Sequence, residues 1–325
     1  MTLPPPAEWA PHAAVWIGFP SHADVWGPPL DGARVETAAF ADAIADGGRG
    51  EKVLLVAADD EAAAAASLLV DGHVKVVVEP FGDVWLRDTA VVVTGDGSAR
   101  DFAFNGWGGK YDFPGDDDIG ARLAKRQGIA FTSLDWFLEG GSVDGDGTGL
   151  AVTTEQCVLN PNRNPGLSQG AAAEKLHADL GFDRVLWLGN GLVNDHTDGH
   201  VDNLARFVGP NRLAIPVAED NDPNWLIYLD AVRRAEAFGI EVVRIPSPGR
   251  VLVDEEVVPA SYMNFYIGNR VVAVPTYGMA NDDAAVAAVQ ALFPNRKAVG
   301  LPASHILTGG GSFHCISQQI PKISA

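Results

Sequence analysis

The chain has 325 residues, of which 47% are hydrophobic, so it can bury a sizeable core, and its formal net charge is -19 at pH 7. That charge argues against nucleic acid and anionic membranes as partners, because both bind clustered Lys and Arg. It would favour the approach of a small cation, although the same charge also serves plain solubility.

The sequence contains no signal for a membrane or secreted location. No stretch approaches the ~20 consecutive apolar residues of a membrane span. The N-terminal residues lack the basic and apolar regions of a secretory signal. Cys157 and Cys315 are the two cysteines, and their wide separation is typical of free thiols in a reducing compartment. We therefore expect a cytoplasmic protein.

Short apolar runs rich in β-branched residues recur along the chain and predict buried strands. They lie at 53–56, 74–78, 90–93, 185–188, 204–208, 213–215, 242–245 and 271–274. Ala-rich or amphipathic stretches between several of them predict helices. These helices cover 61–70, 174–180, 225–238 and 283–293. The alternation predicts an α/β protein.

Five rough strand–helix units can be marked out, without a repeat of fixed period. Periodicity does not decide between a doubly wound sheet and a cyclic arrangement of small βαβ units. No Ser/Gly/Pro-rich linker divides the chain, so we expect one domain over residues 1–325.

Cys315 is the most informative residue, because it closely follows three glycines in the sequence GGGSFHC at 309–315. Glycines let the backbone pass where a side chain would block a pocket. A thiol in such a setting is a candidate nucleophile. Cys157, in the sequence EQCVL at 155–159, is expected to be a small buried hydrophobe, the commonest fate of a free cysteine.

Polar residues alternate in the segment 196–202. If it is extended, His196, Asp198, His200 and Asp202 face the same side. Three interpretations are open: a general acid/base with its carboxylate, a metal site, or a polar turn that leads into the strand at 204–208.

Two further carboxylates stand next to short motifs. Asp88 follows Trp85 just before an apolar strand, which indicates either a surface pair with Arg87 or a carboxylate at a strand end with an aromatic wall. Two carboxylates aimed at one spot would bind a planar guanidinium. Glu139 precedes two glycines, which taken alone indicates a turn.

Together these segments resemble the agmatine deiminase family, relatives of bacterial peptidylarginine deiminase within the guanidine-modifying superfamily. The resemblance runs nearly end to end. Its motifs are PAEWAPH at 6–12, DVWLRDT at 83–89, NGWGGKY at 105–111, LEGGS at 138–142, LNPNRNP at 159–165, TDGHVDN at 197–203, SYMNFY at 261–266 and GGSFHCISQQ at 310–319.

The resemblance implies an α/β propeller of ββαβ-type units with pseudo-five-fold symmetry and a central active site. It implies a cysteine hydrolase that needs neither metal nor other cofactor and converts agmatine to N-carbamoylputrescine and ammonia in putrescine synthesis. By position, Cys315 is expected to be the nucleophile and His200 the general acid/base. Asp88 and Asp202 are expected to clamp the guanidinium, with Glu139 close to the reacting group and Trp85 as the pocket wall.

The implied site contains an electrostatic conflict. Carboxylates near Cys315 disfavour its thiolate and raise its pKa, and they favour His200 as an imidazolium. We expect the resting Cys315 to be mostly a thiol, whose ionisation is completed by the incoming guanidinium cation.

His196 departs from the family pattern, which usually has an acid there, near the far end of the substrate. A histidine leaves the cationic tail of agmatine with one partner fewer. Other functions therefore remain open: a deiminase of another guanidino compound such as arginine at a peptide end, a non-catalytic binder of cationic amines, and a metallohydrolase that uses the alternating segment. The expected partner is a small cationic guanidino substrate, and a homo-oligomer is compatible with the sequence.

Overall fold

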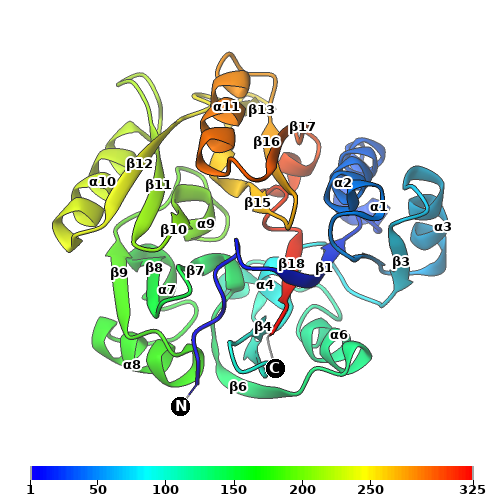
Figure 1. Ribbon diagram of the computed structural model, residues 1–325, viewed down its shortest axis with the longest axis horizontal. Helices are drawn as coiled ribbons and strands as arrows, with labels where there is room; N and C mark the ends of the chain where they lie inside the picture. The colour runs from blue at the N-terminus through cyan, green and yellow to red at the C-terminus, as the bar shows by residue number, and fades with distance from the viewer. Residues whose placement is uncertain (1, 324–325) are drawn as a thin grey trace.

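The computed structural model describes residues 2–323, which form a mixed α/β fold. Within this range, five sheets of three or four strands follow one another around the molecule in chain order (Figure 1). A two-stranded hairpin, β13 (Leu252–Val253) with β14 (Glu256–Val257), accompanies them. No helix among the described residues is long and apolar enough to cross a membrane.

Four of the sheets share one connection pattern. Two antiparallel strands are followed by a helix and by a third strand that runs parallel to the second. Their strands are β4 (Val92–Val93), β5 (Ala99–Ala103) and β6 (Phe131–Phe137); β7 (Val143–Gly145), β8 (Leu150–Thr154) and β9 (Arg184–Leu188); β10 (Arg206–Gly209), β11 (Arg212–Val217) and β12 (Glu241–Pro246); and β15 (Tyr266–Ile267), β16 (Val271–Thr276) and β17 (Lys297–Pro302). The crossover helices are α6 (Ile119–Gln127), α8 (Gln169–Leu180), α10 (Trp225–Phe238) and α11 (Asp282–Leu292).

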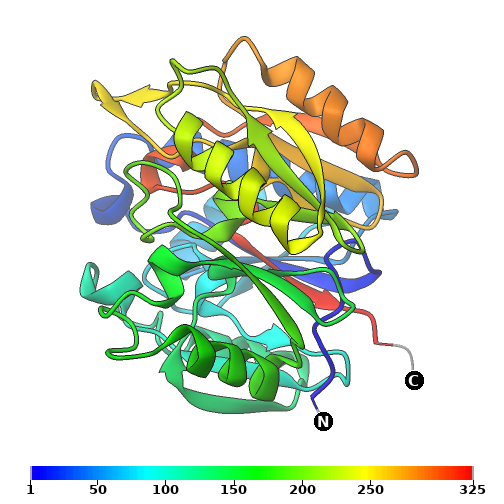
Figure 2. The same ribbon diagram turned by 90° about the vertical axis from the view of Figure 1, so that its left-hand side faces the viewer.

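The remaining sheet joins segments from opposite ends of the chain. Strand β18 (Ser317–Pro321) pairs antiparallel with β1 (His12–Gly18), and the two lie side by side in Figure 2. Strands β2 (Val53–Ala57) and β3 (Lys75–Val78) continue the sheet in parallel, through the crossover helices α2 (Leu30–Ala45) and α3 (Asp60–Leu69). Because Cys315 stands just before β18, this pairing fixes its position.

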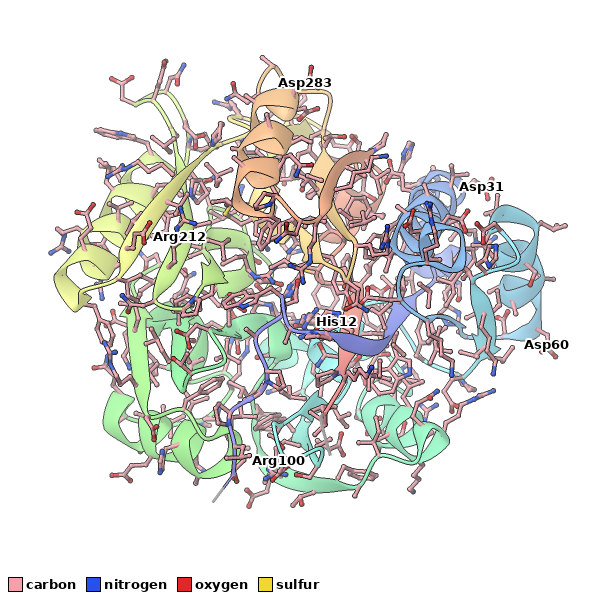
Figure 3. The ribbon with its side chains drawn as sticks, viewed as in Figure 1. His12, Asp31, Asp60, Arg100, Arg212 and Asp283 are labelled. Carbon is pink, nitrogen blue, oxygen red and sulfur yellow. The ribbon has the colours of Figure 1, made fainter. Side chains whose placement is uncertain are left out.

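The long helices lie outside the sheets. Asp60 and Asp283 stand in the first turns of α3 and α11, at the periphery of Figure 3, where a carboxylate faces the positive end of the helix dipole. His12 of β1 is buried near the middle of the same view. The strands supply the apolar core; all five residues of β2, for example, are buried.

Short helical turns connect the larger elements. They are α1 (Ala23–Trp26), α4 (Leu86–Thr89), α5 (Gly106–Gly109), α7 (Glu155–Val158) and α9 (Val201–Leu204), with the 3-10 turns η1 (Asp46–Gly48), η2 (Gly140–Ser142), η3 (Tyr262–Asn264) and η4 (Ile306–Gly309). Several of these turns carry polar residues that are fully buried, and they build the site described below.

The predicted α/β class is confirmed, and the helix predicted at 225–238 has the bounds of α10. Helix α8 begins earlier than predicted because the hydroxyl of Ser168 accepts the backbone N–H of Ala171 and caps it. The strand predicted at 90–93 forms only from Val92. The strand predicted at 204–208 begins at Arg206, because the residues before it form the helical turn α9.

Candidate active site

The site is built from turns that occupy equivalent places in the five larger sheets. Each turn stands directly before the edge strand that pairs antiparallel with the next strand of its sheet. These places are α4 before β4, η2 before β7, α9 before β10, η3 before β15 and the turn of Cys315 before β18. The turns carry Asp88, Gly141, Asp202, Asn264 and Cys315, in that order. Residues that are far apart in the sequence therefore converge at one place.

Gly141 shows how closely these turns approach one another. A Cβ atom at this position would lie 2.7 Å from His200 Nδ1, 2.8 Å from Asp88 Oδ1 and 3.1 Å from Asp202 Oδ2. Its backbone N–H donates to Asp88 Oδ1 at 2.9 Å. Three of the residues predicted for the site thus surround a position where only a glycine leaves them room.

Cys315 is buried beside an amide and a carboxylate. Its Sγ lies 3.0 Å from Nδ2 of Asn264 and 3.5 Å from Oδ2 of Asp202. The amide oxygen of Asn264 accepts the backbone N–H groups of Cys315 and His314, at 3.2 and 3.1 Å. Asn264 therefore orients both the thiol and the backbone that carries it.

Asp88 is not part of a surface ion pair, and it lies in the helical turn α4 rather than at a strand end. It is buried, and its Oδ2 accepts the indole N–H of Trp107 at 3.0 Å. Its Oδ1 lies 3.6 Å from Nδ1 of His200. The neighbouring Arg87 is also buried and points away, toward Glu8 at 3.6 Å.

His200 is fully buried, and unlike Asp88 it does not line the pocket described below. Neither ring nitrogen has a hydrogen-bond partner among the described residues. Ligand atoms of His200, Glu139 and Cys157 all lie within 4.8 Å of one another. Cys157 is buried as expected, but its neighbours are these polar groups rather than apolar side chains alone.

The extended conformation considered for the segment 196–202 is wrong. Asp198 has a positive φ of 63° and pairs with Lys110 and Arg163, while α9 begins at Val201. The backbone turn separates His196 and Asp198 from His200 and Asp202, which both lie next to Gly141. The four residues therefore do not gather into the metal site that alternation would have built.

Glu139, Cys157 and His200 form the one cluster of potential metal ligands found within residues 2–323. Glu139 already accepts Nε of Arg163 at 2.9 Å. A guanidinium at that distance disfavours a second positive charge, so the cluster fits a metal poorly.

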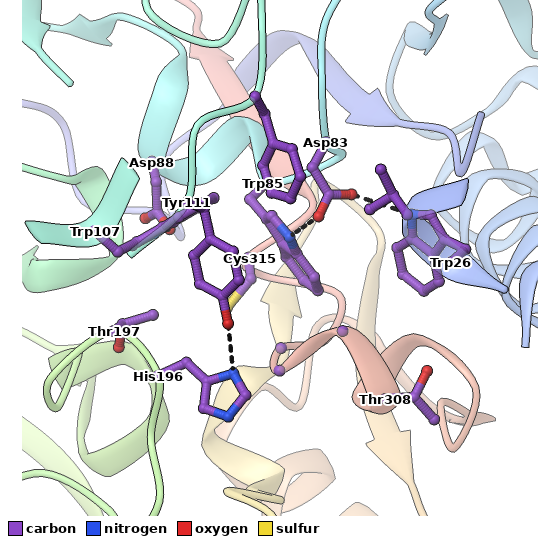
Figure 4. A pocket seen from close by; sticks show the side chains of 15 residues that line it. Trp26, Asp83, Trp85, Asp88, Trp107, Tyr111, His196, Thr197, Thr308 and Cys315 are labelled. Carbon is purple, nitrogen blue, oxygen red and sulfur yellow. Dashed lines mark hydrogen bonds between the residues drawn. The ribbon is translucent and has the colours of Figure 1, made fainter. Parts of the chain in front are cut away.

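A pocket of about 210 Å³ opens onto Cys315 and Asp88 (Figure 4). Trp85, predicted as the aromatic wall, lines it together with Trp107. A Cβ at Gly311 would lie 2.6 Å from the Trp85 ring and 3.0 Å from the thiol sulfur, so this glycine lets both reach the pocket. The glycine-rich stretch before Cys315 thus has the role that its sequence indicates.

His196 and Asp83 are two further polar groups of the pocket, and they lie on different sides of Cys315 in Figure 4. Nδ1 of His196 forms a hydrogen bond of 3.1 Å with the hydroxyl of Tyr111, as Figure 4 shows. Asp83 stands between two indoles and accepts N–H from Trp85 at 2.7 Å and from Trp26 at 3.1 Å. Burial raises the pKa of Asp83 to about 6.

The electrostatics agree in direction with the conflict expected from the sequence. Burial raises the pKa of Cys315 well above its ordinary value, and Asp202 and Asp88 raise it further. Burial lowers the pKa of His200, but the charge of Asp88 leads the opposing effects, so this pKa lies well above its usual range. Burial also raises the pKa of Asp88. The resting site therefore favours a thiol beside an imidazolium.

Sequence analysis did not single out Asn264, Trp107, Asp83, Tyr111 or His314. All except Tyr111 are buried and polar or amphipathic, and all lie in or next to the motifs that carry the family resemblance. The sequence therefore points to these residues only through their position inside those motifs. No local spacing connects, for example, Asn264 with Cys315.

Comparison with known proteins shows the family of this chain. Residues 5–321 match the Porphyromonas-type peptidyl-arginine deiminase family, and the chain belongs to that family. It is similar to the agmatine deiminase of Pseudomonas aeruginosa, with 35% identity over 97% of this chain and 95% of the relative. It is similar also to the agmatine deiminase of Stutzerimonas stutzeri, with 36% identity over the same shares.

Solved structures show the same similarity. The agmatine deiminase of Enterococcus faecalis superposes with a TM-score of 0.91 and 31% identity, covering 99% of this chain and 96% of that one. An amidinotransferase from Microseira wollei, at 11% identity and a TM-score of 0.59, covers 99% of this chain and 98% of its own, and shares the fold alone.

Proposed function

We propose that this protein is an agmatine deiminase, which converts agmatine and water to N-carbamoylputrescine and ammonia with Cys315 as nucleophile. One observation carries the proposal. The thiol lies 3.5 Å from one oxygen of Asp202, and the other oxygen, Oδ1, is buried without a partner. An unsatisfied buried acceptor is costly, and a guanidinium N–H would satisfy it.

A guanidinium carbon is a poor electrophile because three nitrogens share its charge. Asp88 and Asp202 both lie next to Gly141, so we propose that they hold a planar guanidinium by charge-assisted hydrogen bonds beside the sulfur. Orientation of this kind can supply several kcal/mol of the barrier.

The substrate cation also alters the ionisation of the site. As the guanidinium enters between the two carboxylates, the Cys315 thiol releases its proton to solvent, so the total charge of the site is unchanged. The cation offsets the carboxylate charges that raise the pKa of the thiol.

The thiolate then adds to the guanidinium carbon. The imidazolium of His200 gives a proton to the departing nitrogen, the C–N bond breaks, ammonia leaves and an amidino-thioether remains. Neutral His200 next takes a proton from water, whose oxygen adds to the same carbon. The C–S bond breaks and returns the thiolate, the added hydroxyl group loses its proton to solvent to give the ureido product, and the thiolate takes up a proton from solvent.

The far end of the pocket is proposed to hold the substrate tail. His196 is tied to Tyr111 at one side, and Asp83 lies at the other side between Trp85 and Trp26. A neutral histidine offers an ammonium at most a hydrogen bond, and a protonated one repels it. We therefore propose that the tail is bound more weakly here than it would be with an acid at position 196.

We further propose that the five sheets are the units of a pseudo-five-fold propeller that forms one catalytic domain. The repeated place of the site turns, each before the antiparallel edge strand of its sheet, supports this arrangement. The free thiols of Cys157 and Cys315 support a reducing compartment, for which we propose the cytoplasm, and the product would feed putrescine synthesis.

A substrate panel tests the function. Purified protein is given agmatine, arginine, a peptide with C-terminal arginine and methylguanidine, and both ammonia and ureido product are measured. We expect agmatine to give the highest kcat/KM and the Cys315→Ser variant to be inactive on all of them. Mass spectrometry of the quenched wild-type reaction should show the added amidino group on the peptide that contains Cys315. Full activity of Cys315→Ser would contradict the mechanism, and a better substrate than agmatine would reassign the function within the same chemistry.

A further inference from the structure

His314, the residue before the nucleophile, lies between two buried carboxylates. Its Nδ1 is 2.7 Å from Oδ2 of Asp202, and its Nε2 is 2.8 Å from Oε2 of Glu8. All three side chains are nearly or fully buried, with exposed fractions of 3%, 0% and 4%. The family resemblance gives no role to either His314 or Glu8.

These two short contacts define the protonation state of the ring. An ionised carboxylate only accepts hydrogen bonds, whereas a neutral imidazole has a single N–H. Both contacts can therefore be hydrogen bonds only if both ring nitrogens carry hydrogen, or if one of the carboxylates is protonated.

The hydrogen bonds that Glu8 accepts favour its ionised form. Its Oε2 also accepts from Arg206 at 2.8 Å, and its Oε1 accepts the backbone N–H of Ile267 at 2.7 Å. Burial acts to raise the pKa of Glu8, but Arg206 and His314 together hold it well below its usual value. Burial likewise acts to raise the pKa of Asp202, and its hydrogen bond with His314 is the main reason that the pKa is lowered instead.

We propose that His314 is a positively charged positioning residue, which holds Asp202 by Oδ2 and thereby directs the unpartnered Oδ1 of Asp202 toward the substrate. The histidine does not touch the reacting atoms and acts only through Asp202. Its backbone is fixed independently, because its N–H donates to Asn264 and its carbonyl accepts from Arg87 Nε at 3.3 Å. A ring held on such a backbone can position the carboxylate precisely in space.

The surrounding charges balance only when the ring is charged. Arg206 lies 3.4 Å from Asp144 and 2.8 Å from Glu8, and Arg87 lies 3.6 Å from Glu8. With His314 charged, three cations face the carboxylates of Glu8, Asp144 and Asp202. With a neutral ring, negative charge would be in excess behind Cys315 and would oppose the formation of the thiolate.

The charge can be tested directly on the wild-type protein, without reference to the proposed activity. In protein labelled with ¹⁵N at histidine, we expect one ring to show two N–H signals, because each of its nitrogens faces a carboxylate. The signal is assigned to His314 by its persistence in the His200→Asn and His12→Asn variants, which remove the other buried histidines. A spectrum in which no doubly protonated ring persists in both variants would overturn the proposal.

Positioning is tested by two substitutions that each keep half of the interaction, and this arm rests on the proposed function. In His314→Asn, the amide lies where Nδ1 was and can still donate to Asp202; in His314→Gln, it reaches toward Glu8 instead. We expect kcat/KM for agmatine to fall at least ~10-fold further in the Gln variant than in the Asn variant.

The matched control is His12→Asn, which removes another buried histidine–carboxylate pair, with Glu51. We expect it to lower the melting temperature and to leave kcat/KM per folded enzyme unchanged. Equal kinetics of the two His314 variants per folded enzyme would show a merely structural role and overturn the proposal. If wild-type protein is inactive on every guanidino substrate, the proposed function fails, and the ring spectrum still decides the charge of His314. The spectrum likewise decides if neither His314 variant folds.

Discussion

One added methyl group at Gly141 tests whether the convergence of turns is the basis of activity. The Gly141→Ala variant adds a Cβ and no charge or hydrogen-bonding group. Gly141 does not have a positive φ, so its backbone tolerates alanine. Any loss of activity must then come from the space that the new atom takes.

The size of the effect follows from the contacts. The new Cβ would lie 2.7 Å from His200 Nδ1 and 2.8 Å from Asp88 Oδ1, against ordinary contact distances of ~3.5 Å. Each group would have to move by roughly 0.7 Å. Misplacement of catalytic groups by ~1 Å can cost about 10²-fold in rate. We therefore expect kcat/KM for agmatine to fall about 10²-fold, with overpacking costing about 1–3 kcal/mol of stability.

The assay measures kcat/KM by ammonia release, together with thermal unfolding to count folded enzyme. The control is Gly170→Ala in α8, where nothing lies within 4 Å of the added Cβ. We expect the control to keep full activity and to unfold at an equal or higher temperature, because alanine favours a helix. If folded Gly141→Ala keeps more than about a third of the wild-type kcat/KM, the close convergence of the turns at Gly141 is not the basis of activity.

Four further outcomes are expected. Asp88→Asn and Asp202→Asn should each lower kcat/KM at least ~10²-fold, because each loses a desolvated charge-assisted pair; near-wild-type kinetics would return that residue to a structural role. His196→Glu should lower KM for agmatine and change kcat less. The gain in substrate binding free energy should be ~1 kcal/mol or less if the tail is exposed to solvent. An unchanged KM would mean that His196 does not contact the tail. Alkylation of Cys315 by iodoacetamide should still accelerate above pH 9, since burial raises the pKa of this thiol, and a plateau near pH 7 would contradict that. Burial raises the pKa of Asp116 to about 7, so the folded state keeps a proton that the unfolded chain loses near pH 4. The free energy of unfolding should therefore fall as pH rises from about 4 to 7. Asp116→Asn should flatten this slope when urea unfolding is measured across that range.

The sequence predicts the α/β class and most long helices, because these depend on local periodicity. It fails at the turns that carry the site. The strand expected to begin at 204 instead follows a helical turn, and Asp88 also lies in a helical turn of four residues. Turns this short have no periodic pattern, so an alternation of polar residues such as that in 196–202 can be mistaken for an extended segment.

The chemistry of the candidate site could be predicted only as far as the resemblance reaches. The structure places Asp88, Asp202 and His200 around Gly141, and Cys315 beside Asp202, but their spacing in the chain contains no information about that convergence. Contacts such as that of Asn264 with Cys315 depend on how two sheets meet. They become visible only when the tertiary structure is known.

The pairing of β18 with β1 also determines when during biosynthesis the site can form. The carboxylates, His200 and Asn264 are all synthesised before Cys315, and the strand that fixes the cysteine has to pair with β1, which is synthesised long before it. Non-local pairings of this kind form late in folding. A nascent chain therefore holds its charged residues without the Cys315 thiol among them. Hydrolysis of free guanidino compounds cannot begin on the ribosome until the last sheet has closed.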